Sequence, residues 1–185
     1  MQGLIEMIIV MGVPGAGKTT VLQGLKENVR VINYGTLMFD IAKERYGVSN
    51  RDEIRKLSVE KQRTVQKEVA ETLSHEKGMV VLDTHCSVKT PKGYLPGLPF
   101  DLLAKLDVDA LVLVTAKPED IFRRRENDPT RIRKETLEEL KEHDAINKAL
   151  LAVYAAHRGC PAKIIYNMEG ESEKASAELQ KIIRD

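Results

Sequence analysis

The sequence predicts an α/β fold, a three-layer α/β/α arrangement around a five-stranded parallel sheet. Five short apolar runs recur along the 185 residues, and segments with helical periodicity separate them. This alternation is typical of a parallel sheet with helices on both faces. A glycine-rich loop joins the first apolar run to the helix after it, as in folds that bind phosphate. The length suits one domain, residues 1–185.

The first elements follow from an apolar run and the amphipathic pattern after it. Residues 7–11 (Met-Ile-Ile-Val-Met) are continuously apolar, as expected of a strand buried on both faces. The glycine-rich loop comes next. Val21, Leu22 and Leu25, with charged neighbours, then predict an amphipathic helix.

The middle of the chain predicts a short strand followed by a helical region. Residues 29–34 form the second strand, which ends at Gly35-Thr36. Apolar positions then recur at helical spacing, and Asn50 or Asp52 is suited to cap a segment that opens with Arg51. A long helix is expected from Ser58 to Glu76.

The second half repeats the alternation. Residues 79–83 form a buried strand, and 84–99, with three prolines and two glycines, is expected to be a long loop. Pro118 is placed at the favoured first turn of a helix. The remaining elements are a helix at 100–106, a strand at 109–115, a helix at 135–157, a strand at 162–166 and a helix at 172–184.

The glycine-rich loop has a specific pattern. Gly12-Val13-Pro14-Gly15-Ala16-Gly17-Lys18-Thr19-Thr20 matches G-x-x-x-x-G-K-[ST], whose backbone N–H groups wrap nucleotide phosphates. Lys18 supplies charge for the outer phosphates, and the Thr19 hydroxyl is a ligand for Mg²⁺. A glycine-rich turn with a chance lysine is the alternative, but the order strand, loop, helix favours a nucleotide-binding loop.

Charged side chains follow the ends of other predicted strands, where ligands of such sheets bind. Asp83 ends the third strand and either holds Mg²⁺ through water or caps the next turn. Residues 121–134 contain six basic residues and only two acidic ones. This excess of positive charge predicts either a lid over phosphates or a solvated helix end. The basic residues are Arg123, Arg124, Arg125, Arg131, Arg133 and Lys134.

A pair of arginines and a histidine can each be interpreted in two ways. Arg51 and Arg55 share a helix face, where they either bind a phosphate or pair with neighbouring acids. His85 follows the third strand, and a lone His there is more often a structural hydrogen-bonding group than a catalyst.

Composition limits the class of protein. The net charge of +1 gives no indication of a nucleic-acid or membrane partner, and no apolar run approaches a membrane span. No leader pattern is present, so a cytoplasmic protein is expected. Cys86 and Cys160 are unclustered, which argues against zinc and against a disulfide framework.

Several stretches together resemble the archaeal-type adenylate kinases, nearly end to end. They are residues 12–20, Tyr34-Gly35-Thr36, residues 51–57, and Asp83-Thr84-His85 with the segment 89–99. The resemblance implies reversible phosphoryl transfer from Mg·ATP to AMP, giving two ADP and maintaining adenine nucleotide balance. It also implies a homotrimer.

The resemblance further implies a role for particular residues. Residues 12–20 would hold ATP, and Gly35, Thr36, Arg51 and Arg55 would lie at the AMP site, in a small helical region at about 36–76. Residues 123–134 would form a short lid without zinc. Lys18, Arg125, Arg131 and Arg133 would act on the transferring phosphate. Lys89 is the hypothesised source of the charge that an arginine supplies to AMP phosphate in bacterial members.

Two other kinds of function stay open at this point. One is a kinase of another nucleoside monophosphate or small acceptor. The other is an ATPase or RNA-processing module that hydrolyses ATP slowly, although aromatic residues make up only 4% of the chain and no RNA-binding pattern accompanies them.

Overall fold

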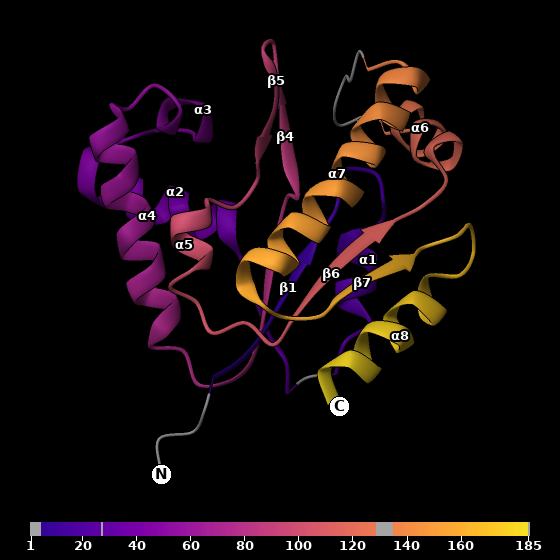
Figure 1. Ribbon diagram of the computed structural model, residues 1–185. Helices are drawn as coiled ribbons and strands as arrows, with labels where there is room; N and C mark the ends of the chain where they lie inside the picture. The colour runs from indigo at the N-terminus through magenta and orange to yellow at the C-terminus, as the bar shows by residue number, and fades with distance from the viewer. Residues whose placement is uncertain (1–4, 27, 129–134, 185) are drawn as a thin grey trace.

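A computed structural model describes residues 5–26, 28–128 and 135–184. Its centre is a five-stranded parallel sheet in the order β2-β3-β1-β6-β7, which confirms the predicted fold class (Figure 1). The strands are β1 (Ile5–Met11), β2 (Arg30–Asn33), β3 (Gly78–Thr84), β6 (Ala110–Thr115) and β7 (Ala162–Tyr166). All five run in the same direction, so their carboxyl ends meet at one edge.

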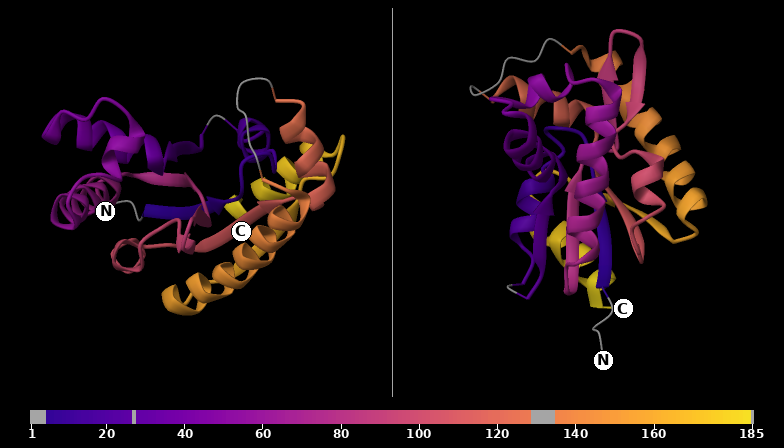
Figure 2. Two further views of the ribbon diagram at one scale, coloured as in Figure 1. Left: turned by 90° about the horizontal axis from the view of Figure 1, so that it is seen from above. Right: turned by 90° about the vertical axis from the view of Figure 1, so that its left-hand side faces the viewer.

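Helices cover both faces of this sheet, as the edge-on view in Figure 2 shows. On one face lie α2 (Tyr34–Tyr46), α4 (Val59–Ser74), α5 (Phe100–Leu103) and α7 (Leu137–Arg158). On the other face lie α1 (Lys18–Gln23) and α8 (Ser172–Arg184). Alternate residues of β1 serve the two faces: Met7 and Ile9 pack on the first, and Ile8 and Val10 on the second.

The remaining helices, α3 (Arg51–Ile54) and α6 (Pro118–Glu126), lie beside the carboxyl edge (Figure 1). Their ends follow local sequence signals. The Asn50 side chain caps α3 by accepting from two backbone N–H groups, and Ser58 caps α4. Thr136 and Glu139 form a reciprocal capping box at the start of α7, and Gly159 ends that helix in a left-handed conformation.

The prediction of a loop at 84–99 is wrong in one respect. Strands β4 (Ser87–Thr90) and β5 (Gly93–Pro96) form an antiparallel hairpin there, a separate two-stranded sheet. Three prolines and the lack of apolar alternation hid it in the sequence. The hairpin forms because Ser87 and its neighbours pack on α7, and because Gly93, with φ of 116°, allows the tight turn.

Two smaller boundaries also differ from the prediction. Tyr34 begins α2 instead of ending the second strand, because Asn33 caps the helix by accepting from the Thr36 backbone N–H. The helix expected at 100–106 ends at Leu103. Within the described ranges, no helix combines the length and apolar character that a membrane crossing requires.

Candidate functional site

The glycine loop, residues 12–20, connects β1 to α1 at the carboxyl edge of the sheet. Gly15 and Gly17 have φ of 91° and 80°, which side chains other than glycine rarely adopt. At Gly12, an added Cβ would lie 2.6 Å from the Val114 carbonyl oxygen, so the loop packs directly on β6. The glycines therefore let the backbone fold tightly against the sheet.

Two buried side chains from elsewhere in the chain hold this loop. Arg125 Nε donates to the Pro14 carbonyl oxygen at 2.7 Å, and Asn167 Nδ2 donates to the Ala16 carbonyl oxygen at 3.0 Å. Arg125 also forms an ion pair with Glu135, ahead of α7. With its carbonyl groups fixed from behind, the loop has a preorganised shape before any ligand arrives.

Lys18 and Asp83 meet where the loop approaches the end of β3. Their side chains form an ion pair, and Asp83 also accepts a hydrogen bond from Asn33 Nδ2 at 2.8 Å. Burial lowers the pKa of Lys18 to about 8, which still leaves the ammonium as the major form at pH 7. The edge thus presents a cation beside an oriented carboxylate.

Asn33 extends this contact toward the helical region. Its Oδ1 accepts from the Thr36 backbone N–H at 2.9 Å and from the Thr36 hydroxyl at 3.0 Å. Arg51 Nη2 in turn donates to Thr36 Oγ1 at 2.7 Å. A continuous polar chain therefore runs from Lys18 through Asp83, Asn33 and Thr36 to Arg51.

Two pockets adjoin at this edge. The helix-side pocket lies between α2, α3, α4 and the end of β3, and the loop-side pocket lies over the glycine loop. Both are lined by the same five residues: Lys18, Asn33, Arg51, Asp83 and His85. A group at this junction contacts both pockets at once.

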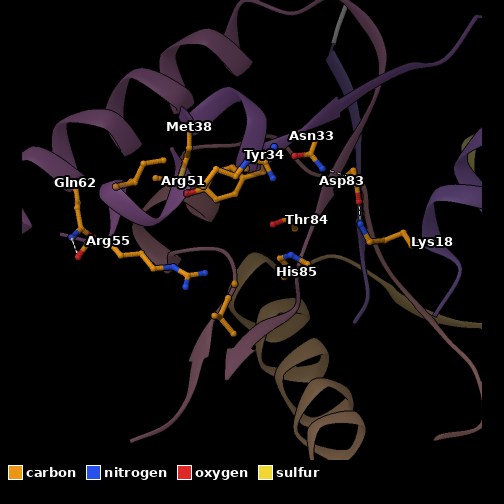
Figure 3. Close-up of a pocket in the computed structure, with 14 residues that line it drawn as sticks. Lys18, Asn33, Tyr34, Met38, Arg51, Arg55, Gln62, Asp83, Thr84 and His85 are labelled. Carbon is orange, nitrogen blue, oxygen red and sulfur yellow. Dashed lines mark hydrogen bonds and ion pairs between the residues drawn. The ribbon is translucent and has the colours of Figure 1, made fainter. Parts of the chain in front are cut away.

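Most of the predicted site residues line one of the two pockets. Gly35 and Arg55 line the helix-side pocket, together with Tyr34, Met38, Ile54, Gln62, Thr84, Val88 and Gly97. Thr19 lines the loop-side pocket, together with Gly12, Val13, Pro14, Gly15, Gly17 and Asp128. Figure 3 shows the helix-side pocket, with Lys18 and Asp83 at one end and Gln62 and Arg55 at the other.

Other predicted residues have different surroundings. Within the described residues, Thr36 and Lys89 line neither pocket; Lys89 Nζ lies 2.8 Å from Glu139 Oε1. That hydrogen bond raises the pKa of Lys89. Ala16 turns its carbonyl to Asn167, and Thr20 lies on the side facing α8.

The lid prediction is only partly covered by the structure. Arg125 is 8% exposed and contacts the glycine loop from behind, whereas Arg123 is exposed and pairs with Asp120. Arg124 donates to the Asn167 carbonyl oxygen at 3.1 Å. Arg131 and Arg133 lie outside the described residues.

The residues that sequence reasoning missed are mainly neutral amides. Asn33, Gln62 and Asn167 belong to no motif, and only the position of Asn33 and Asn167 at strand ends could have indicated them. His85, left as a structural group, lines both pockets, with Nδ1 3.4 Å from the Gly12 carbonyl oxygen. Partial desolvation and then the nearby Lys18 charge lower its pKa, which favours the neutral imidazole at pH 7.

The fold and the loop define a nucleotide-binding kinase domain, and comparisons with known proteins agree. Residues 11–141 match the family model described as an AAA domain. A shikimate kinase from Acinetobacter baumannii, solved with shikimate, has the same fold with a TM-score of 0.59. Its sequence identity is 18%, and the match covers 99% of this chain and 94% of that chain.

Relatives of higher sequence identity identify the family within this class of kinase domains. The adenylate kinase of Thermoplasma acidophilum is 46% identical over 95% of this chain and 97% of its own length. The adenylate kinase of Methanothermobacter thermautotrophicus is 40% identical over 96% of this chain and 99% of its own length. The chain therefore belongs to the archaeal-type adenylate kinase family. The prediction of a nucleoside monophosphate kinase, and of an adenylate kinase in particular, is confirmed.

Proposed function

We propose that this chain catalyses reversible phosphoryl transfer from Mg·ATP to AMP, giving two ADP and so balancing the adenine nucleotides. The observation that carries the proposal is the pair of pockets that share Lys18, Asp83 and His85. A donor in one pocket and an acceptor in the other would bring their phosphates together at the shared residues. Positioning and charge stabilisation are what phosphoryl transfer requires of a protein.

The proposed roles follow this division. Residues 12–20 hold ATP through backbone N–H groups, and Lys18 stabilises charge on the transferring group. Gly35, Thr36, Arg51 and Arg55 bind AMP within the helical region at about 36–76. Arg131 and Arg133 act on the transferring phosphate from the lid region at 123–134. Arg125 is proposed to join them by exchanging its contacts with the Pro14 carbonyl and Glu135 for the phosphate. Lys89 is tested as an AMP-phosphate ligand by measuring AMP affinity in Lys89→Ala.

Mg²⁺ is the proposed metal, brought with the nucleotide. Thr19 and Asp83 both line the loop-side pocket; the first carries a hydroxyl group and the second a carboxylate oriented by Asn33. Both are hard oxygen donors of the kind that Mg²⁺ prefers, with the carboxylate acting through water. The ion neutralises phosphate charge when bound. We propose no zinc site in the lid, since the sequence has only two cysteines, which lie 74 positions apart (160 − 86) and outside it.

A cytoplasmic homotrimer is the proposed form, with no nucleic-acid or membrane partner. One face of α7 supports self-association, because Ala145, Ala149, Ala152, Val153 and Ala156 are exposed there without a charge among them. Sedimentation equilibrium tests this proposal: a mass three times 20.8 kDa supports it, and a monomer at micromolar concentration refutes it.

The proposed reaction is tested by following Mg·ATP with AMP, CMP, UMP, GMP or no acceptor, with the products separated by chromatography. Rapid ADP formation only with AMP supports the proposal. Equal turnover with several acceptors would indicate a broader monophosphate kinase. ATP loss without an acceptor would instead indicate an ATPase module. Chelation of the metal should stop the reaction in every case.

A further inference from the structure

The amide of Gln62 has a fixed orientation in the helix-side pocket. Gln62 lies in the first turn of α4, and its Nε2 donates to the Leu57 carbonyl oxygen at 2.8 Å and to the Arg55 carbonyl oxygen at 3.4 Å. Carbonyl oxygens only accept hydrogen bonds, so the nitrogen must face them. The assignment of the two amide atoms therefore follows from chemistry.

The oxygen of the same amide remains available. Within the described residues, Gln62 Oε1 has no hydrogen-bond partner, and Gln62 lines the pocket. Because both N–H donors are directed at the chain's own backbone, the group that Gln62 can offer to a ligand is a hydrogen-bond acceptor.

The position of Gln62 in the pocket indicates which part of a nucleotide it meets. Figure 3 shows Gln62 at the end opposite the Lys18–Asp83 pair. Phosphate belongs at the junction with the loop-side pocket, which Lys18 and Arg51 line and Arg55 does not. Tyr34 and Met38 lie between the two ends and offer apolar surface to a flat ring (Figure 3). A nucleoside monophosphate bound with its phosphate near Lys18 and its ring along Tyr34 and Met38 therefore has its base directed toward Gln62.

We propose that Gln62 Oε1 accepts a hydrogen bond from the exocyclic amino group of the acceptor base and so selects amino-bearing bases. The 6-amino group of adenine is such a donor. A base with an oxo group at that position would bring two acceptor oxygens together. The inference rests on the proposed function, and it deepens it by assigning base selection to one side chain.

The size of the effect follows from unpaired polar groups. A site built to accept a hydrogen bond loses it with the wrong base and leaves a polar atom unsatisfied, which costs about tenfold or more in selectivity. Removing the acceptor should lower the use of the amino-bearing base and leave the oxo base little changed.

The test compares AMP with inosine monophosphate, which carries an oxygen in place of the 6-amino group. Gln62→Leu is the variant. Gln66→Leu is the matched control, since Gln66 lies one turn further along α4, is partly buried and does not line the pocket. We expect the ratio of kcat/KM for AMP over inosine monophosphate to fall by about tenfold or more in Gln62→Leu. In Gln66→Leu the ratio should equal that of the wild type.

Two results would overturn the assignment. An unchanged ratio in Gln62→Leu means that the base is read elsewhere. An equal loss for both acceptors means that Gln62 only anchors the backbone at Leu57. If Gln62→Leu does not fold, as judged by circular dichroism, Gln62→Met replaces it because methionine keeps the length of the side chain.

Direct binding separates this inference from the proposed reaction. Calorimetric titration of each protein with AMP and with inosine monophosphate, without ATP, measures selectivity independently of chemistry. A wild type without acceptor-dependent turnover overturns the proposed reaction alone. Loss of binding selectivity in Gln62→Leu still supports the role of Gln62, and retained selectivity refutes it.

Discussion

At the scale of single residues, Lys18 is the group whose removal should matter most to turnover. Lys18→Met keeps the apolar stem and removes only the charge. We expect kcat to fall by about 10²–10³-fold, because a positioned cation at developing charge has that value. The fold should persist, since Asp83 keeps the hydrogen bond from Asn33. Steady-state kinetics with circular dichroism measures both effects.

Lys26→Met serves as the control for this variant. Lys26 lies just beyond α1 and lines neither of the two adjoining pockets. The turnover of Lys26→Met should match that of the wild type. Near-normal turnover in Lys18→Met would mean that the glycine loop is not the phosphate site.

The residues that sequence analysis found are those with a charge or a place in a contiguous motif. Lys18 belongs to a loop pattern, and Asp83 ends an apolar strand. Asn33, Gln62 and Asn167 act through hydrogen bonds to partners from 3 to 151 positions away. A neutral amide carries no signal until the fold sets its partner, so these three could not be assigned from sequence.

At the scale of elements, the hairpin is tied to α7 through buried polar contacts. Ser87 Oγ donates to Asn147 Oδ1 at 2.6 Å, and His143 Nε2 lies 3.0 Å from the same hydroxyl. Asn147 is 1% exposed. Asn147→Ala leaves the Ser87 hydroxyl buried without its acceptor, so we expect a loss of about 1–3 kcal/mol in the free energy of unfolding. Urea denaturation measures this loss.

A double-mutant cycle with Ser87→Ala checks the physical cause. If the lost hydrogen bond explains the effect, the double variant should be less destabilised than the sum of the two single variants. Additive losses would instead show that Asn147 contributes by packing alone.

This junction also explains why the hairpin escaped the sequence analysis. Its strands are four residues long, and they pair outside the main sheet. Their stabilisation comes from α7, which is 60 positions away at Asn147. The central strands β1, β3 and β6, by contrast, can be recognised in the sequence as continuous apolar runs because both of their faces are largely buried. Tertiary packing therefore determines the hairpin, whereas the local sequence pattern is enough to indicate the central strands.

At the scale of the whole molecule, the two pockets share residues, so their ligands should act on each other. A ligand that binds only the folded state at 100 times its Kd adds about 2.7 kcal/mol to the free energy of unfolding. For a chain of this size that corresponds to a rise in Tm of about 5–11 °C. AMP and a non-hydrolysable ATP analogue with Mg²⁺ should each raise Tm separately.

Together, the two ligands should shift Tm by more than the sum of the separate shifts. Lys18, Asp83 and Arg51 line both pockets, so a ligand in one pocket orders side chains that the other ligand also needs. Differential scanning calorimetry at matched multiples of each Kd measures the coupling. Because Lys18 is shared, Lys18→Met should lose the excess over the sum while it keeps part of each separate shift. Strictly additive shifts in the wild type would show that the pockets bind independently, and the junction would then serve the chemistry without linking the two binding events.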